Sequence, residues 1–476
     1  MPKKIGGVLA LVGLCAMSLF LVNCGSSSSR PTGLLYVLTE GTNGMGNNVS
    51  SFAIDLGSGG LSLVNSNAST CSTLSSNPPV SCGPPLDILL DTTGGAAFVL
   101  NQGVPCQHVS STCELDNSGN PTVSVPPTIY PYTVNSDGSF SSPGTPIPLS
   151  HPTSSTDTQD DADLALDMVR DAAGNFLFVL NQGSTPAPGN CQFDPLPQGN
   201  FDACPSISVF AMTAGSNTLK FVGGSPNNAG SPLRLSRIPT ALSAITFTPQ
   251  GSNTAEEFLF VTGIQDLTTL HNDNTLSVYQ VNTTTGALTE LVNSPYATST
   301  DPISVLAVNT NSAASGAGGV FVYVGSQPTA SGALSIFQMC TVVGVAGCTP
   351  SDVTNARLVP VTTPPPATGQ NPVGMAVDPT NSFLYVACYG QNAVYGYHIA
   401  NNTGVLTALS PSSQQTGSQP VALALHPSVN NTGQFLYTSN SGSANISGFR
   451  LSTTSGAMSN PITVVSPSTP SGMVAK

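Results

Sequence analysis

Residues 371–406, NPVGMAVDPTNSFLYVACYGQNAVYGYHIANNTGVL, read as three short strands and the start of a fourth. Residues 375–377 are apolar, 378–381 carry the turn formers Asp-Pro-Thr-Asn, and the β-rich run 383–387 follows. Residues 394–397 alternate after a polar break, before a further turn and strand. Because about four strands cannot bury both faces of their own sheet, this unit predicts that similar units pack beside it.

The second strand of this unit recurs along the chain. A triplet with a central aromatic residue occurs seven times, at Tyr36, Phe98, Phe178, Phe260, Tyr323, Tyr385 and Tyr437. The strand after it, with an apolar residue three positions before an aromatic one, also occurs seven times, ending at Phe52, Tyr132, Phe210, Tyr279, Phe337, Tyr397 and Phe449. Repeats of this kind are typical of a β-propeller. We therefore predict an all-β fold, a seven-bladed β-propeller with four-stranded blades, over residues 33–476.

The two ends of the propeller region predict how the ring closes. The first unit starts at the strand of Tyr36 and lacks the strand that opens the sixth unit at residues 372–375. The chain ends in Pro470-Ser471-Gly472-Met473-Val474, which matches the absent strand. We expect this C-terminal strand to pair into the first blade, because closure removes open sheet edges.

The N-terminus has the pattern of an export signal. Lys3 and Lys4 precede an apolar run over residues 5–22. The run ends in Leu-Val-Asn-Cys, which resembles a bacterial lipobox whose cysteine, here Cys24, is lipidated. We expect a signal peptide at 1–23, a flexible tether at 24–32 and an exported lipoprotein of the cell envelope, periplasmic or on the cell surface. The alternative is an uncleaved membrane anchor.

Composition narrows the classes of partner. Charged residues make up 7% of the 476, and the formal net charge is −13. Nucleic acid is not an expected partner, because no basic stripe is available to neutralise phosphates. A neutral or cationic partner fits this charge better.

Eight of the cysteines form four local pairs. An exported chain lies in an oxidising compartment, so we expect disulfides within loops rather than metal ligation, the alternative. The expected pairs are Cys71–Cys82, Cys106–Cys113, Cys191–Cys204 and Cys340–Cys348. Cys388 is left over and is expected to be a buried free thiol.

Long loops are expected on one face of the propeller. Residues 103–128 and 183–206 would join second to third strands, and residues 65–84 and 150–162 would connect blades. The same face would present His108, His151, Arg234, Arg237 and His271. Because binding residues often lie on loops held by a rigid scaffold, we expect a protein or glycan partner here. The alternative is that each of these side chains is merely solvated.

Two acidic residues stand apart from this set. Alignment of the units places Asp87 and Asp167 near the start of adjacent innermost strands, facing the mouth of the channel. Two neighbouring carboxylates could bind a cation such as Ca²⁺ or act as an acid/base pair. The alternative is a hydrated polar lining of the channel. Otherwise no cofactor is expected.

The Asp-Pro-Thr-Asn-Ser-Phe-Leu-Tyr-Val core and the Asn-Asn-Thr-Gly-Val-Leu turn resemble the lactonase-type seven-bladed propellers, which include bacterial 6-phosphogluconolactonases and related YVTN-repeat proteins. The resemblance implies the same fold and lactone hydrolysis, with an Arg and a His after the Pro of an inner strand binding the lactone. The matching positions are Pro372-Val373-Gly374 and Pro420-Val421-Ala422, so neither Arg nor His is present. We therefore predict first a binding scaffold that uses the loop-rich face. The second prediction is a divergent lactonase that uses Asp87 and Asp167 with His or Arg residues of that face.

Overall fold

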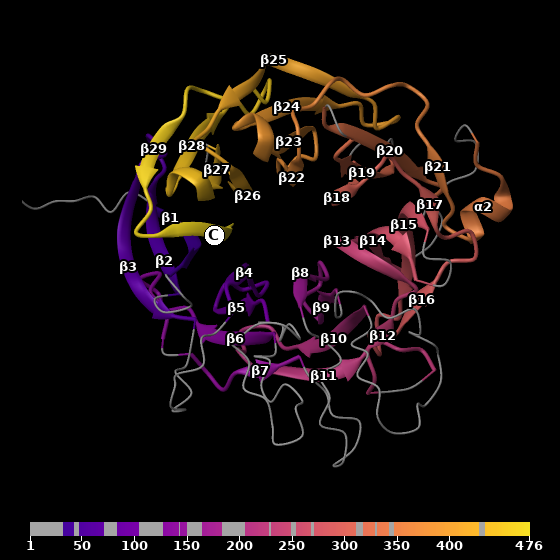
Figure 1. Cartoon of the computed structure of the whole chain (residues 1–476), viewed down its shortest axis with the longest axis horizontal. Helices are drawn as coiled ribbons and strands as arrows, with labels where there is room; N and C mark the ends of the chain where they lie inside the picture. Colours follow the sequence, from indigo (N-terminus) through magenta and orange to yellow (C-terminus); the bar gives the residue numbers. More distant parts are fainter. Residues whose placement is uncertain are drawn as a thin grey trace, which may run out of the picture. The chain divides into compact units, whose positions relative to one another are not determined.

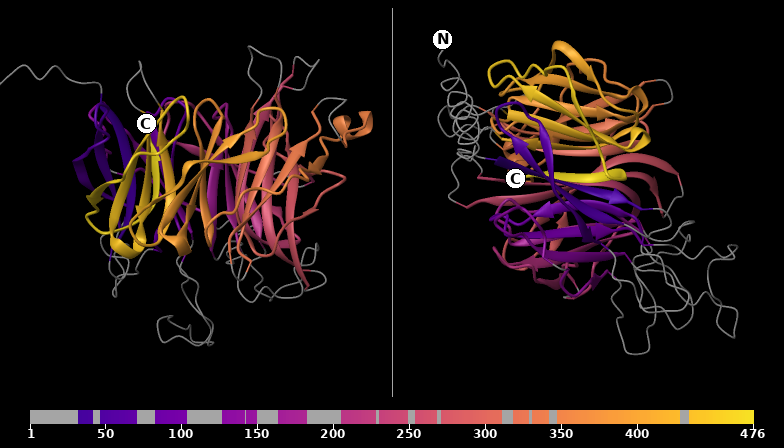
Figure 2. Two further views of the ribbon diagram at one scale, coloured as in Figure 1. Left: turned by 90° about the horizontal axis from the view of Figure 1, so that it is seen from above. Right: turned by 90° about the vertical axis from the view of Figure 1, so that its left-hand side faces the viewer.

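The structure is a computed structural model in which the strands form a ring of sheets. It describes residues 32–41, 47–70, 83–103, 127–141, 143–149, 164–182, 205–227, 230–248, 254–267, 271–310, 318–328, 331–341, 347–427 and 434–476. Gly33–Lys476 form one compact unit. In the described part, seven antiparallel sheets follow one another in chain order around a common axis (Figure 1). Figure 2 shows the same sheets from the side. The seven-bladed β-propeller predicted from the repeats is confirmed.

Each sheet is one blade, numbered here 1 to 7, and the strands run from the innermost to the outermost. Blade 1 contains β30 (Thr469–Ala475), β1 (Thr32–Glu40), β2 (Asn48–Asp55) and β3 (Leu61–Ser69). Blade 2 contains β4 (Pro85–Leu90), β5 (Ala96–Asn101), β6 (Thr128–Thr133) and β7 (Ile147–Pro148). Blade 3 contains β8 (Ala165–Arg170), β9 (Phe176–Asn181), β10 (Ser206–Met212), β11 (Leu219–Gly223) and β12 (Leu233–Arg234).

Blade 4 has the longest inner strands of the ring. Blades 4 and 5 contain β13 (Arg237–Phe247), β14 (Glu256–Asp266), β15 (Asn272–Val281), β16 (Leu288–Glu290) and β17 (Tyr296–Ala297); and β18 (Pro302–Asn309), β19 (Val320–Ser326), β20 (Ala333–Met339) and β21 (Leu358–Pro360). Blades 6 and 7 contain β22 (Pro372–Val377), β23 (Phe383–Cys388), β24 (Ala393–Ile399) and β25 (Leu406–Gln415); and β26 (Pro420–His426), β27 (Gln434–Asn440), β28 (Asn445–Leu451) and β29 (Ile462–Val465).

The C-terminal strand closes the ring as predicted. β30 pairs antiparallel with β1, in a register that runs from Leu35 opposite Ala475 to Glu40 opposite Thr469. Beyond this pairing, the backbones of Leu34 and Lys476 exchange two hydrogen bonds of 2.9 and 2.8 Å. The first blade therefore contains both ends of the propeller sequence. Its innermost strand, β30, covers the edge of β1 that would otherwise be unpaired.

The hydrophobic core lies between the blades. The second strand of most blades is buried at every position, as in β5, β9, β19, β23 and β27. Successive side chains of such a strand point to opposite faces of the sheet. Phe258 and Phe260 of β14 thus pack with Val320 and Val322 of blade 5, whereas Leu259 on the opposite face packs with blade 3. The aromatic triplets are continuously hydrophobic because their side chains pack against the blades on both sides of the strand.

Tyrosine hydroxyls connect successive blades. Each belongs to the second strand of one blade and donates to a glycine carbonyl in the turn between the two outer strands of the next. The three bonds run from Tyr323 to Gly404 at 3.0 Å, from Tyr385 to Gly456 at 2.8 Å and from Tyr437 to Gly59 at 3.0 Å. The last of them joins blade 7 to blade 1 across the closure of the ring.

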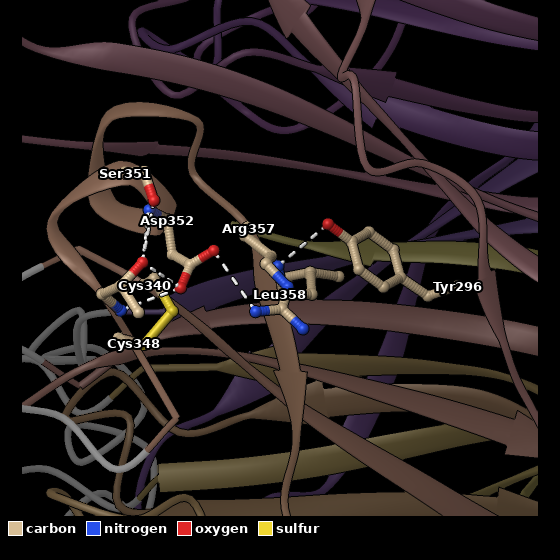
Figure 3. A network of polar contacts seen from close by, with 8 residues as sticks. Tyr296, Cys340, Cys348, Ser351, Asp352, Arg357 and Leu358 are labelled. Carbon is tan, nitrogen blue, oxygen red and sulfur yellow. Dashed lines mark hydrogen bonds and ion pairs between the residues drawn. A yellow bond between two sulfur atoms is a disulfide. The ribbon is translucent and has the colours of Figure 1, made fainter.

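A short helix, α2 (Pro350–Thr354), follows β20 and precedes β21 in the chain and lies at the periphery of the ring (Figure 1). Figure 3 shows the polar contacts around it. The Thr349 side chain accepts a hydrogen bond from the Asp352 amide, and the Thr349 amide donates one of 2.8 Å to the Asp352 carboxylate, so the two residues cap the N-terminus of the helix. Arg357 forms an ion pair of 3.2 Å with Asp352. The Leu358 amide then donates to the Tyr296 hydroxyl of blade 4 at 3.1 Å, which joins the start of β21 to the neighbouring blade.

Some elements were not predicted from the sequence. These are α2, the short strands β12 and β17, and the 3₁₀-helices η2 (Tyr389–Gln391) and η3 (Ser441–Ser443). Among the helices in the described part of the chain, none has the length and apolar character needed to cross a membrane.

Candidate functional site

The innermost strands share a bulge near their start. Seven of them surround the axis: β4, β8, β13, β18, β22, β26 and β30 (Figure 1). Each shifts its register against the second strand within its first residues, as between Pro85 and Asp87. The bulge places one residue per blade at an equivalent position. These residues are Asp87, Asp167, Ala241, Ser304, Gly374, Ala422 and Gly472.

This bulge position faces the inner strand of the following blade at short range. A Cβ added to Gly472 would lie 2.5 Å from the Leu86 carbonyl oxygen and 3.0 Å from the Asp87 Cα. At Gly374 the nearest atom would be the Leu423 amide nitrogen at 3.7 Å. Small residues therefore suit the position, and two of the seven blades depart from this by carrying a carboxyl group.

Side chains near the bulge link consecutive inner strands. The inner edge of each first strand has no strand partner, so its backbone groups need other hydrogen bonds. The Ser471 hydroxyl donates to the Pro85 carbonyl at 2.7 Å, and the Thr240 hydroxyl donates to the Pro302 carbonyl at 2.7 Å. The Ser304 hydroxyl donates to the Pro372 carbonyl. Hydroxyl groups thus make the links in these three blades.

Carboxyl groups make the corresponding links from blades 2 and 3. Asp167 accepts a hydrogen bond of 2.8 Å from the Met168 amide and one of 3.2 Å from the Leu242 amide of blade 4. Asp87 accepts one of 2.7 Å from the Ile88 amide. The Met168 amide of blade 3 also lowers the pKa of Asp87, so both carboxyl groups lie around one backbone N–H. The two acids expected at adjacent inner strands are therefore close together.

The environment of this pair favours its protonated form. Burial raises the pKa of Asp87 well above its usual range, and the negative charge of Asp167 raises it further. Burial also raises the pKa of Asp167, to about 6, against the opposing effect of the amides of Leu242 and Met168. Both side chains are only partly buried and keep some contact with solvent. Two neighbouring carboxyl groups whose pKa values are both raised can offer one acid and one base to a bound molecule.

A metal would find few protein ligands here. Within the described ranges, no three His, Cys, Asp or Glu side chains come together to hold an ion. Ca²⁺ usually takes six to eight oxygen ligands. The pair by itself thus offers two carboxyl groups, and burial opposes the ionisation of both.

The described residues from which two long intervening segments leave lie at the end of the ring where the pair lies. Pro85 at the start of β4 is opposite Asn101 at the end of β5, and Ala165 is opposite Asn181. The segments that leave Asn101 and Asn181 therefore attach beside the bulges of Asp87 and Asp167. The predicted residues His108 and His151 belong to segments outside the described residues.

The other residues of the predicted binding face are present at this end. Arg237 at the start of β13 lies 3.1 Å from Asp273 and 3.5 Å from Asp266, and these two carboxylates neutralise it. Arg234 on β12 and His271, at the turn before β15, are exposed. The structure does not bring any of the three into hydrogen-bond contact with Asp87 or Asp167.

Of the predicted disulfides, Cys340–Cys348 is formed, with the two Cα atoms 5.6 Å apart (Figure 3). Cys388 is buried and unpaired, as expected, and burial raises the pKa of its thiol to about 11. Cys24 and the pairs Cys71–Cys82, Cys106–Cys113 and Cys191–Cys204 lie outside the described residues.

Sequence reasoning missed a second pair of carboxyl groups, between blades 3 and 4. Glu257 is 2% exposed and Asp171 is 1% exposed. Burial raises the pKa of Glu257 to about 8, and the charge of Asp171 adds to the effect. The sequence did carry a signal for Glu257, which stands two residues before the aromatic triplet of blade 4. At this place blades 3 and 6 have the uncharged residues Asn175 and Ser382, so an acidic residue is a departure from the repeat.

Comparisons with known proteins agree with this architecture. The sequence model of the family described as "Lactonase, 7-bladed beta-propeller" matches residues 352–474. The search of curated proteins finds no match. Three solved structures are similar over 94% of this chain. The first is a periplasmic gluconolactonase, PpgL, of Pseudomonas aeruginosa (15% identity, 99% of that chain, TM-score 0.55).

The second is a putative 6-phosphogluconolactonase of Bacteroides uniformis (10% identity, 99% of that chain, TM-score 0.54), and the third is a protein of Lactobacillus plantarum (11% identity, all of that chain, TM-score 0.55). At these identities the likeness concerns the fold. The chain is thus a seven-bladed β-propeller, and its residues 352–474 match the sequence model of that lactonase family.

Proposed function

We propose that this protein hydrolyses a lactone at the end of the ring where Asp87 and Asp167 lie, with these two residues as an acid/base pair. One observation carries the proposal: two coupled carboxyl groups occupy bulge positions that Ala, Ser or Gly fills in the other five blades. Burying carboxyl groups is costly, and strongly shifted pKa values cluster at functional sites. Two of the similar structures are a gluconolactonase and a putative 6-phosphogluconolactonase, which adds support by analogy of fold.

The proposed reaction uses the two protonation states of the pair. Ionised Asp167 takes a proton from a water molecule as the water oxygen forms a bond to the lactone carbonyl carbon. The ring C–O bond then breaks, and protonated Asp87 gives its proton to the departing alkoxide. The product is an open hydroxy acid, and the pair returns to its starting state by exchanging protons with solvent. This scheme needs neither Arg nor His at positions 373–374 and 421–422.

The test is turnover of a panel of sugar and aryl lactones by the wild type and by Asp87→Asn and Asp167→Asn. Each variant should lose roughly 100-fold or more in kcat, the range that general acid/base groups supply. Ser304→Ala is the matched control, since it removes a side-chain link at the same bulge position without touching the pair. In the wild type, kcat should rise as the pH increases through about 6.

Unchanged circular dichroism and thermal midpoint would show that the variants fold. Full activity in both Asn variants, or no turnover of any lactone by the wild type, would overturn the proposal.

A second function is proposed for the same end of the ring, namely binding of a protein or glycan partner. It rests on the exposed Arg234 and His271 and on the long segments that attach there. Arg234→Ala with His271→Ala should weaken binding on a glycan array while leaving lactone turnover unchanged. Equal binding by the wild type and the double variant would contradict this use of the face.

Export and lipid anchoring through Cys24 are proposed from the N-terminal sequence. Metabolic labelling with a radioactive fatty acid should mark the wild type and leave Cys24→Ser unlabelled. Labelling of both proteins, or of neither, would contradict a lipid anchor at this cysteine.

A further inference from the structure

Polar side chains meet in the seam between blades 3 and 4, at the end of the ring opposite the bulges of the inner strands. Thr246, near the end of β13, and Glu257, near the start of β14, are directly opposite one another in this antiparallel pair. Ala244 and Leu259, two positions further into the sheet, pack with blade 3. Because residues two positions apart point to the same face of a strand, Thr246 and Glu257 also face blade 3.

Asp171 enters the same seam from blade 3. It follows directly after β8, and its carboxylate accepts a hydrogen bond of 2.9 Å from the Phe176 amide. The charge of Asp171 raises the pKa of Glu257, so the two carboxyl groups are within electrostatic reach of each other. The seam thus brings together two carboxyl groups and one hydroxyl from three different elements.

Two oxygens of this group have no hydrogen-bond partner among the described residues. They are Oε1 of Glu257 and Oγ1 of Thr246, and both atoms are buried. The Glu257 side chain as a whole is 2% exposed, so solvent does not satisfy it. Buried polar atoms are normally hydrogen-bonded, and leaving them unpaired costs free energy. These two oxygens therefore point to a ligand that the protein itself does not supply.

The charge of the group narrows the choice of ligand. In the described part of the chain neither carboxyl group forms an ion pair, and the Arg170 guanidinium donates instead to the carbonyls of Leu90 and Asp171, at 2.9 and 3.0 Å. A proton on Glu257, whose pKa burial raises to about 8, removes the charge but leaves Oε1 unpaired. A water molecule can pair with Oε1 but leaves the carboxylates unneutralised. A cation does both.

We propose that Asp171, Thr246 and Glu257 bind a Ca²⁺ ion in the seam between blades 3 and 4. Ca²⁺ takes six to eight oxygen ligands in flexible geometry and accepts carboxylates that bind through both oxygens. Two carboxylates balance its charge, and with the hydroxyl they supply most of these ligands. Mg²⁺ fits less well, because it demands near-ideal octahedral geometry and usually keeps several water molecules. This site does not depend on the proposed lactone hydrolysis.

Ca²⁺ titration of the full chain at a pH above 8 tests the proposal, by calorimetry and by urea unfolding with Ca²⁺ or with a chelator. The wild type should give heat and have a higher urea midpoint with Ca²⁺, because an ion that binds only the folded state stabilises it. Glu257→Gln should show neither effect. Glu256→Gln is the matched control, because it removes the same charge from the next residue, which points to the opposite face of β14. It should respond like the wild type.

Competition with protons gives a second signature. Since Ca²⁺ displaces the proton of Glu257, the apparent affinity of the wild type should fall by about tenfold for each pH unit below 8. Thr246→Val should weaken binding, because it removes one ligand. Asp87→Asn should keep the heat, which separates this site from the pair at the other end of the ring.

No response of the wild type to Ca²⁺, or an equal response in Glu257→Gln, would overturn the proposal and leave lactone hydrolysis standing. Blade 7 has Gln434 at the position equivalent to Glu257, so the substitution suits the fold, and circular dichroism checks this. If Glu257→Gln does not fold, Thr246→Val decides, and an unaltered affinity for Ca²⁺ in that variant would also reject the site.

Discussion

The hydroxyl of Tyr437 is predicted to stabilise the closure of the ring. It donates to the Gly59 carbonyl at 3.0 Å, and both residues are buried. Tyr437→Phe keeps the ring in the core but leaves this carbonyl without its donor. A buried hydrogen bond contributes about 1 kcal/mol net, and an unsatisfied buried acceptor costs about 1–3 kcal/mol. We expect the free energy of unfolding to fall by about 1–2 kcal/mol.

Tyr36 gives a matched control at the equivalent position of blade 1. Its side chain is fully buried, and among the described residues its hydroxyl has no hydrogen-bond partner. Tyr36→Phe removes a desolvated polar atom, so it should leave the stability unchanged or raise it by about 1 kcal/mol. The two substitutions have the same chemistry and the same burial, and they differ in whether the hydroxyl has an acceptor.

The measurement is urea unfolding followed by tyrosine fluorescence and circular dichroism, with thermal scans beside it. For a unit of 444 residues, the unfolding entropy is about 0.9 kcal/mol/K, so 1 kcal/mol shifts the thermal midpoint by only about 1 °C. The urea midpoint is therefore the more sensitive readout. Equal midpoints for Tyr437→Phe and Tyr36→Phe would refute the role assigned to the bond.

Three further predictions follow from the fold and the carboxyl groups. Truncation after Ser468 removes β30 and should lower the thermal midpoint sharply or prevent folding. The control Val465→Thr, on the exposed outer strand β29, should leave the thermal midpoint unchanged. An unaltered midpoint in the truncated chain would contradict closure by β30. Glu257 has a folded-state pKa of about 8, above its usual value, so its stabilising contribution is complete at low pH and is lost as the pH rises toward 8. The free energy of unfolding should thus fall by on the order of 3 kcal/mol across that pH range. In Glu257→Gln, the urea midpoint should fall less as the pH rises. Parallel curves of urea midpoint against pH for the two proteins would exclude Glu257 as the cause. Calorimetric titration with Ca²⁺ should give heat in the wild type and none in Asp87→Asn if the pair binds the ion, and absence of heat in both removes calcium from this site.

Much of the fold could be predicted from the sequence because the second strand of each blade is buried on both faces. That double burial requires continuous apolar runs, and so the triplets around Tyr36 or Tyr385 recur with little change. Ring closure could be predicted as well, because the first unit begins at β1 without an innermost strand and the C-terminus supplies that strand. The proximity of Asp87 and Asp167 followed from the alignment, since the bulge gives each blade the same register.

Contacts between blades were harder to predict, because each depends on two segments far apart in sequence. The partner of Tyr437 is 378 positions away. The ion pairs of Arg237 arise only when β13, β14 and β15 extend together beyond the usual strand length. Helix α2 is five residues long and depends on its capping box and the adjacent disulfide, so it leaves little periodic signal.

The hydrogen bonds that Ser and Thr hydroxyls make between inner strands indicate that the carboxyl pair is not needed for the fold. Ser471, Thr240 and Ser304 join consecutive inner strands with neutral side chains, so closing the channel wall does not require a carboxyl group. Asp87 and Asp167 make links of the same kind, although burial makes both costly to ionise and the charge of Asp167 adds to the cost for Asp87. A residue that serves only the fold gains nothing from that cost, whereas a carboxyl group with a raised pKa is useful to a catalyst of hydrolysis. The contrast within one ring, between neutral links and a charged pair, is therefore the strongest structural reason to place the chemistry between blades 2 and 3.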